Sequence, residues 1–278
     1  MKKFFKTIGW ALSIIFVLLI FAMKIHGVKR KCKKYLMDPQ SMSIDVRYHI
    51  VYKLAKYTLF IKRYSVESQG TVDLPNIPSL YVANHKSFID PIVLFKILYE
   101  NAKIPYFRFV AKQELLNRSF VSAALKLVDT IFINRSNFHS TFAAFNEINF
   151  KKDNRTIIIF PEGTRIYDAE KINDFHPGSF RIAYNSLIPI IPVAIVGLND
   201  NRNKKLKSYK NKSRIIYVSF LKQIKPQEYG NTNINYTATG AHDQISDEYM
   251  RIFNLIKDNK KHIKVFEQKD EPTKEVRY

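Results

Sequence analysis

Short apolar runs alternate with longer segments of helical spacing from about residue 79 onward. Apolar runs of four to eight residues between polar turns are typical of buried strands, whereas an apolar residue every three or four positions predicts a helix. Buried strands that alternate with helices favour an α/β fold, in which a mostly parallel central sheet is flanked by helices. The predicted strands are 79–83, 107–111, 130–134, 156–160, 190–196 and 214–221. The predicted helices are 91–100, 119–128, 139–151, 178–186 and 241–262.

The same pattern suggests how the chain is divided. Residues 1–38 hold an apolar run with basic flanks, residues 39–262 hold the predicted α/β domain, and residues 263–278 form a charged C-terminal tail. Within the domain, the polar segments 199–213 and 226–240 are predicted to be loops.

The uncharged run from Thr7 to Met23 predicts a membrane-anchoring helix. As a helix it is about 25 Å long, near the lower limit for crossing a bilayer core. A cleaved signal peptide and a buried core helix are the alternatives, but the run is longer than a usual signal peptide and no small-x-small cleavage site follows it. The basic residues after the run favour a cell-membrane location, with the domain on the cytoplasmic side and an attraction to anionic headgroups.

Charge narrows the class of function less than the motifs do. The formal net charge is +21, and +12 remains when the basic first 34 residues are set aside. A membrane-tethered nucleic-acid-binding protein would also be this basic, but it would not explain the polar motifs described below. The single Cys32 excludes an internal disulfide framework and a cysteine-based zinc site. Because the histidines show no ligand spacing, no metal site and no cofactor are predicted.

The stretch "YVANHKSFIDP" places His85 and Asp90 where a strand ends and a helix begins. On a continuous helix the two side chains would lie about 140° apart, so the pair can meet only across a non-helical turn. A carboxylate that fixes the tautomer of a histidine makes a general base. The structural alternatives are an incidental turn histidine and an aspartate that caps the helix, with either Ser87 or Asp90 as N-cap and Pro91 close to the first turn.

A second strand breaks into a polar turn in "IIIFPEGTR". Gly163 allows backbone N–H groups to approach an anion, Thr164 offers a hydroxyl, and Arg165 offers a planar fork for a phosphate. Glu162 cannot bind an anion itself, so we expect it to orient Arg165 or to accept a hydrogen bond from a substrate hydroxyl. A plain strand-to-loop turn with a surface Glu–Arg pair is the alternative.

Together, "NHKSFID", "FPEGTR" and the intervening "VAKQELLNRSFVSAALKLVDTIFINR" resemble the 1-acyl-glycerol-3-phosphate acyltransferase family, the lysophosphatidic acid acyltransferases of phospholipid synthesis. The resemblance covers about residues 75–200. It implies that His85 and Asp90 are the catalytic H-x4-D pair. It also implies that Glu162, Gly163 and Thr164 bind the substrate and that Arg135 and Lys112 contact the phosphate, on which the planar fork of Arg165 is expected as well.

The chain departs from the family pattern at four positions. Ser122 and Asp129 stand where glycines are usual, and Asn134 stands where an acid precedes the arginine of the second block. His176 replaces a lysine that often follows the E-G-T turn. These changes put the preference for acceptor or acyl donor in question.

The resemblance implies transfer of a fatty acyl group from acyl-CoA or acyl-carrier protein to the sn-2 hydroxyl of lysophosphatidic acid, which gives phosphatidic acid without an acyl-enzyme. Glycerol-3-phosphate or another lysolipid as acceptor, and a catalytically silent lipid-binding homologue, remain open alternatives.

Overall fold

The computed structural model describes residues 2–71, 73–101, 104, 106–134, 145, 148, 154–165, 168–198, 214–258 and 265–266, with side chains from residue 15 onward. The predicted helix 139–151 and the predicted loop 199–213 lie almost wholly outside these residues.

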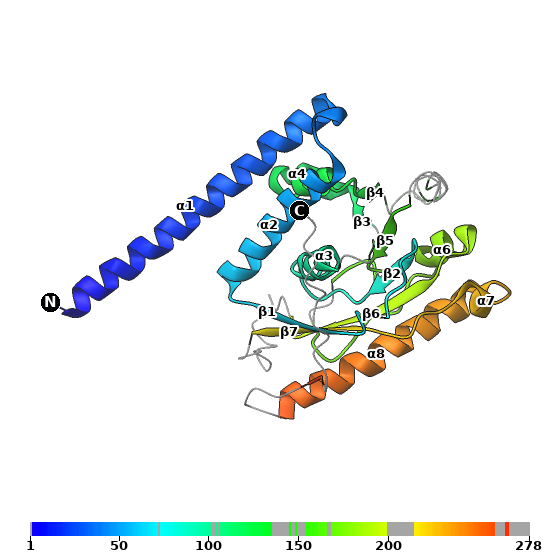
Figure 1. The fold of residues 1–278 in the computed structure, drawn as a ribbon. Helices are drawn as coiled ribbons and strands as arrows, with labels where there is room; N and C mark the ends of the chain where they lie inside the picture. Colours follow the sequence, from blue (N-terminus) through cyan, green and yellow to red (C-terminus); the bar gives the residue numbers. More distant parts are fainter. Residues whose placement is uncertain are drawn as a thin grey trace.

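A seven-stranded sheet in the order β1-β7-β6-β2-β5-β3-β4 forms the centre of the molecule (Figure 1). Of the strand pairs that the structure describes, β6 and β7 are antiparallel and the others are parallel. The mostly parallel α/β sheet is therefore confirmed, and the six predicted strands are present. The strands are β1 (Ser65–Gln69), β2 (Leu80–Ala83), β3 (Phe107–Lys112), β4 (Ile131–Ile133), β5 (Thr156–Ile159), β6 (Ile190–Val196) and β7 (Ile215–Phe220).

Helices cover both faces of the sheet (Figure 1). Because side chains alternate along a strand, Tyr81 of β2 packs against one helical layer and Val82 against the other. The first layer consists of α2 (Ile44–Lys62), α3 (Asp90–Glu100) and α4 (Ser119–Leu127), and the second of α6 (Arg181–Ser186), α7 (Pro226–Tyr229) and α8 (Ile234–Asp258). The 3₁₀ helices are η1 (Pro39–Ser41), η2 (Gln113–Asn117) and η3 (Pro177–Phe180).

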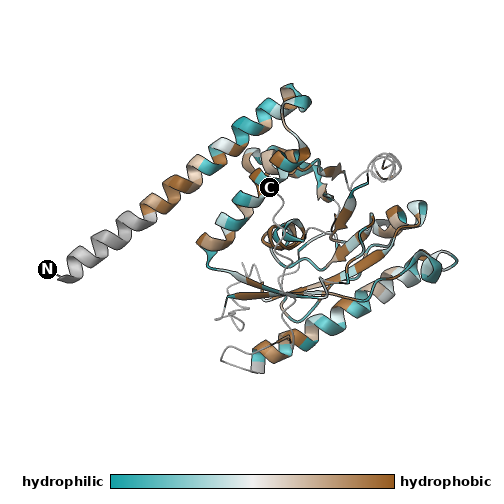
Figure 2. Ribbon diagram, in the orientation of Figure 1, coloured by the Kyte–Doolittle hydropathy of each residue, from teal (hydrophilic) through white to brown (hydrophobic). Residues whose placement is uncertain are grey.

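The N-terminal helix α1 (Lys2–Met37) extends away from the sheet, with its C-terminal half against α2 and α4 (Figure 1). Its middle is apolar (Figure 2), and Phe16 and Met23 each have 64% of their surface exposed. Within the described part of the chain, no helix combines the length and the apolar character that a membrane crossing requires. A membrane-spanning helix is thus not supported within this part of the chain, and the membrane-anchoring role of residues 7–23 stays a prediction.

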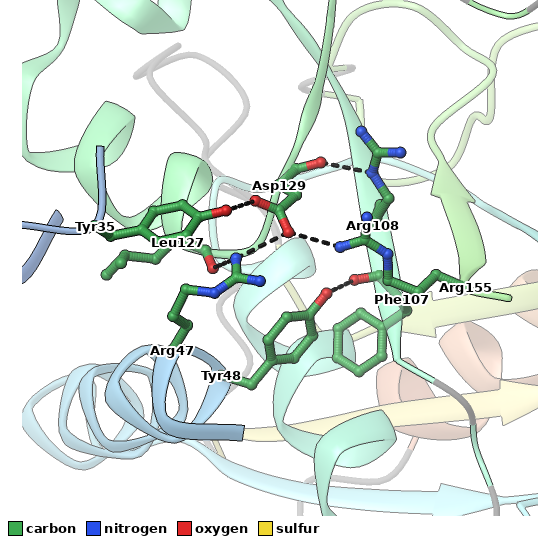
Figure 3. Close-up of polar contacts among 8 residues, drawn as sticks. All are labelled: Tyr35, Arg47, Tyr48, Phe107, Arg108, Leu127, Asp129 and Arg155. Carbon is green, nitrogen blue, oxygen red and sulfur yellow. Dashed lines mark hydrogen bonds and ion pairs between the residues drawn. The ribbon is translucent and has the colours of Figure 1, made fainter. Parts of the chain in front are cut away.

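Asp129, in the turn between α4 and β4, joins the N-terminal helices to the sheet (Figure 3). Its carboxylate accepts hydrogen bonds from Tyr35 of α1 and Arg47 of α2 at 2.8 Å, and from Arg155 before β5 at 2.7 Å. Burial alone would raise the pKa of Asp129, but these hydrogen bonds outweigh it and hold the pKa below its ordinary value. The backbone φ of +49° is the left-handed conformation that glycine adopts most easily. The aspartate that replaces the expected glycine is thus a cross-link between three elements.

The last predicted loop and helix differ from the structure. Residues 226–240 were expected to be a loop, but they contain α7 and the start of α8, which begins seven residues before the predicted helix 241–262. Beyond α8, Val265 and Phe266 are buried, and the ring of Phe266 lies 5.7 Å from that of Tyr217 in β7.

Candidate active site

The strand order brings the two polar motifs to one edge of the sheet. His85 follows β2, Glu162 follows β5, and these parallel strands are direct neighbours. Lys112 ends β3, the next strand along the sheet. The carboxyl ends of parallel strands are where α/β proteins place their ligands. The candidate site therefore lies at the carboxyl edge formed by β2, β5 and β3.

His85 and Asp90 meet across the turn between β2 and α3. The Nδ1 atom of His85 lies 2.9 Å from Oδ2 of Asp90, whose side chain is fully buried, whereas that of His85 is 21% exposed. The acceptor-only carboxylate requires the proton on Nδ1, so Nε2 carries the lone pair that can accept a proton. This geometry is that of a histidine general base held by a carboxylate.

The expectation that Asp90 caps α3 is wrong. Asp90 is the first residue of the helix, Ile89 holds the N-cap position, and no side chain caps this end. The Asp90 carboxylate turns back instead and accepts from the backbone N–H groups of Lys86 and Ser87, each at 2.7 Å. Three donors therefore converge on one oxygen and fix it opposite the imidazole.

Glu162 connects the two motifs through backbone donors. Its Oε1 accepts from the N–H of His85 at 2.6 Å, and its Oε2 accepts from the N–H of Asn173 at 3.1 Å. Burial raises the pKa of Glu162, although these hydrogen bonds and the nearby Lys86 act in the opposite direction. Sequence reasoning missed this link because it joins groups 77 positions apart in the chain. The predicted contact of Glu162 with Arg165 or a substrate hydroxyl stays a prediction.

The E-G-T-R turn lies directly after β5. Gly163 has a φ of +72°, which explains the glycine, and its N–H donates to the carbonyl of Phe160 at 3.2 Å. That donor closes the turn, so it is engaged within the protein. Thr164 is exposed and Arg165 is half-buried, so both lie at the surface where a substrate can approach.

Of the two further predicted phosphate ligands, the structure describes only Lys112. Lys112 is exposed at the end of β3, on the same edge of the sheet as the motifs. Arg135 lies outside the described residues, two positions after the end of β4. Their contact with a phosphate stays a prediction.

Sequence reasoning missed three residues that shape the site. The ring of Phe160 stacks on the imidazole of His85 at 4.4 Å between centroids, which limits its rotation. Asn84 exchanges two hydrogen bonds with the backbone of Ile195 in β6, so the turn is tied to the neighbouring strand. Lys86 is buried inside the turn.

Among the residues that the structure describes, no group of three or more His, Cys, Asp or Glu side chains is arranged to hold a metal ion. His176, which replaces the usual lysine, is exposed, and its N–H donates to the carbonyl of Pro161 at 3.0 Å. Its backbone thus supports the base of the E-G-T-R turn.

Comparison with known proteins places the chain in a family. The Acyltransferase family matches residues 65–196. A protein of Mycoplasma genitalium named "Probable 1-acyl-sn-glycerol-3-phosphate acyltransferase" is 33% identical over 86% of this chain and 90% of its own length. A protein of the same name from Mycoplasma pneumoniae is 29% identical over 86% of this chain and 91% of its own length.

The fold also has a solved counterpart. The crystal structure of the 1-acyl-sn-glycerophosphate (LPA) acyltransferase PlsC from Thermotoga maritima matches with a TM-score of 0.63 at 19% identity. The match covers 88% of this chain and 97% of that chain. On the sequence relatives above, whose whole length this chain nearly spans, the protein belongs to the 1-acyl-sn-glycerol-3-phosphate acyltransferase family.

Proposed function

We propose that this chain transfers a fatty acyl group from an acyl thioester to the sn-2 hydroxyl of 1-acyl-glycerol-3-phosphate and so forms phosphatidic acid. The observation that carries the proposal is the His85–Asp90 pair, which presents Nε2 of a fixed imidazole at the carboxyl edge of the sheet. The names of the mycoplasma relatives support the same reaction.

The reaction needs one base and no acyl-enzyme. Nε2 of His85 removes the proton of the acceptor hydroxyl as its oxygen attacks the thioester carbonyl. The new O–C ester bond forms, the C–S bond breaks, and the proton passes from His85 to the leaving thiolate. Asp90 stabilises the imidazolium that exists between these two proton transfers. A cofactor has no step to perform, because the thioester already activates the carbonyl.

The acceptor phosphate binds on the same edge of the sheet. Arg165 supplies a planar guanidinium and Thr164 a hydroxyl after β5, and Lys112 ends the neighbouring strand β3. Arg135 is assigned to the same phosphate on the family resemblance. A cationic rim of this kind holds a phosphate monoester and leaves the sn-2 hydroxyl directed at His85.

The acyl donor is acyl-CoA or acyl-carrier protein. Both present a thioester on a long flexible arm, and the net charge of +12 outside the first 34 residues would attract either polyanionic CoA or an acidic carrier protein. Charge alone does not distinguish the two donors.

The protein acts at the cytoplasmic surface of the cell membrane, where its lipid acceptor lies. The exposed apolar side chains of α1, which include Phe16, Leu19 and Met23, provide a surface that can enter the headgroup region, and the basic residues that follow attract anionic lipids.

The test of this proposal is a substrate matrix with the purified full-length protein in lipid. Lysophosphatidic acid and glycerol-3-phosphate are offered separately, each with acyl-CoA and with acyl-carrier protein. Formation of phosphatidic acid from lysophosphatidic acid is expected, and the productive pairing names the donor. Turnover of glycerol-3-phosphate alone would move the enzyme one step earlier, and no turnover with any pairing would overturn the proposal.

A further inference from the structure

Lys86 is a buried cation inside the catalytic turn. Lys86 is 1% exposed, although it lies in the chain directly between His85 and Ser87. Burial of an ammonium group is unfavourable unless hydrogen bonds and opposite charges compensate for it. The contacts of this side chain therefore indicate what it stabilises.

The ammonium group of Lys86 holds the segment that follows the E-G-T-R turn. Its Nζ donates to the carbonyl oxygen of Asp168 at 2.8 Å and to that of Lys171. The same Nζ lies 5.2 Å from the ring centroid of Tyr249 in α8, whose hydroxyl donates to the carbonyl of Ala169 at 2.8 Å. Residues 168–171 thus fold over a buried cation, and α8 closes the far side.

These contacts belong to a hydrogen-bond network that includes the catalytic histidine. Two residues after Lys171, the N–H of Asn173 donates to Glu162 Oε2, and the other oxygen of Glu162 accepts from the N–H of His85. The backbone N–H of Lys86 itself donates to Oδ2 of Asp90. The side chain of Lys86 therefore holds residues 168–171 in this network, while its backbone N–H holds Asp90.

We propose that Lys86 is a positioning residue for acyl transfer, whose ammonium group fixes residues 168–173 and, through Glu162, the main chain of His85 opposite Asp90. This inference rests on the proposed function, because its readout is acyl transfer. Lys86 touches no reacting atom and acts through the placement of the base. Loss of its charge should therefore lower kcat more than it changes the KM for the acceptor.

The charge of Lys86 also makes this hydrogen-bond network depend on pH. Burial lowers the pKa of Lys86 to about 8, while the carboxylates of Glu162, Asp168 and Asp90 act in the opposite direction. As the pH rises through this value, the ammonium group becomes an amine, and both the charge-assisted hydrogen bonds and the contact with the Tyr249 ring weaken.

The effect of this titration on stability has the opposite sign to its expected effect on kcat, so the two can be separated. The pKa of Lys86 is lower in the folded chain than its ordinary value of 10.5. Between these values the unfolded chain binds more protons, so the contribution of Lys86 to the free energy of unfolding increases with pH. Titration of Lys86 therefore does not unfold the protein between pH about 8 and 10.5, and a loss of kcat in this range has another cause.

The experiment compares Lys86→Met, Lys86→Arg and wild type as full-length protein in lipid, with kcat and KM measured across the alkaline range. Lys257→Met is the matched control, since Lys257 contacts Glu170 in the same segment through an ion pair more than half exposed. Exposed pairs of this kind contribute little, so this variant should behave as wild type. Circular dichroism and thermal unfolding establish the folded fraction of each protein.

We expect folded Lys86→Met to lose on the order of 10-fold to 100-fold in kcat, with a change in acceptor KM of less than about threefold. Lys86→Arg should restore most of the activity and lose the alkaline decrease near the pKa of Lys86, because a guanidinium stays charged there. These results would support the positioning role.

An unchanged kcat in folded Lys86→Met would overturn the inference, as would a loss that only follows the unfolded fraction. If Lys86→Met does not fold, the pH profile of Lys86→Arg decides, because an alkaline decrease identical to that of wild type would exclude the charge of Lys86 as its source. Absence of turnover in wild type would instead overturn the proposed function, and this inference with it.

Discussion

At the scale of single residues, the most informative side chain is Asp90. An aspartate before a proline at a helix start is ordinarily a cap, but here the carboxylate points back to His85 and to two backbone N–H groups. Its negative charge is therefore available to stabilise an imidazolium, which an uncharged amide cannot do.

Asp90→Asn should keep the turn and lower kcat by about 10²-fold to 10⁴-fold, because the amide stabilises neither the required tautomer nor the imidazolium. Steady-state kinetics with lysophosphatidic acid measures this change. Asp247→Asn, at an exposed position of α8, is the matched control. A kcat within a few fold of wild type in folded Asp90→Asn would show that the aspartate has only a structural role.

The residues of the site differ in how far the sequence predicted them. His85 and Asp90 were singled out because polar, ionisable groups at the end of an apolar strand are conspicuous, and the structure brings their side chains together. Lys86 and Phe160 were missed because a lysine is ordinarily solvated and a phenylalanine is ordinarily core. The sequence does not show that residues 168–171 approach Lys86 or that Phe160 stacks on the imidazole.

At the scale of secondary-structure elements, apolar runs located the strands well, whereas segments of mixed polarity did not reveal their elements. The central strands are continuous apolar runs, and each was located to within one residue or so. The edge strand β1 (Ser65–Gln69) was missed because its sequence SVESQ is mostly polar. The first turns of α8 were missed because the polar Thr237 and the small Ala238 carry its buried face there, and they add little to a hydrophobic pattern.

The cross-link at Asp129 belongs to this scale, because it holds α1 and α2 against the sheet (Figure 3). Asp129→Asn should lower the free energy of unfolding by about 1–3 kcal/mol near neutral pH, since the buried guanidinium of Arg47 loses its counter-charge. Chemical denaturation measures the difference, with exposed Asp243→Asn as the control.

The pH dependence of that difference follows from the lowered pKa. The contribution of the Asp129 carboxylate is fully present above its ordinary pKa of 3.8 and is lost as the pH falls below that value. The stability difference between wild type and Asp129→Asn should therefore stay constant down to about pH 4 and then shrink. A difference that does not shrink in acid would contradict the role of the charge.

At the scale of the whole molecule, strand order creates the site. The two motifs are 77 positions apart at their point of contact, and β3 and β4 lie between them in the chain, yet β2 and β5 are neighbours in the sheet. Local sequence pattern carries no information about this order. The family resemblance therefore supplied what the hydrophobic pattern could not.

The position of α1 leads to a prediction about membrane binding. Replacement of Phe16 and Leu19 by serine should weaken binding to vesicles that contain anionic lipid by at least about 10-fold, because two large exposed apolar side chains no longer enter the lipid. Vesicle co-sedimentation measures this loss. Leu187→Ser, at an exposed apolar position outside α1, serves as control, and an equal loss in that variant would exclude a specific role for α1.

The role of His85 as the general base is tested by the rate at which wild type and His85→Ala form phosphatidic acid from lysophosphatidic acid. We expect turnover by wild type and a loss of at least about 10³-fold in the variant, with an unchanged far-ultraviolet spectrum and thermal transition. Comparable turnover by a folded His85→Ala protein would contradict the assignment of His85 as the base.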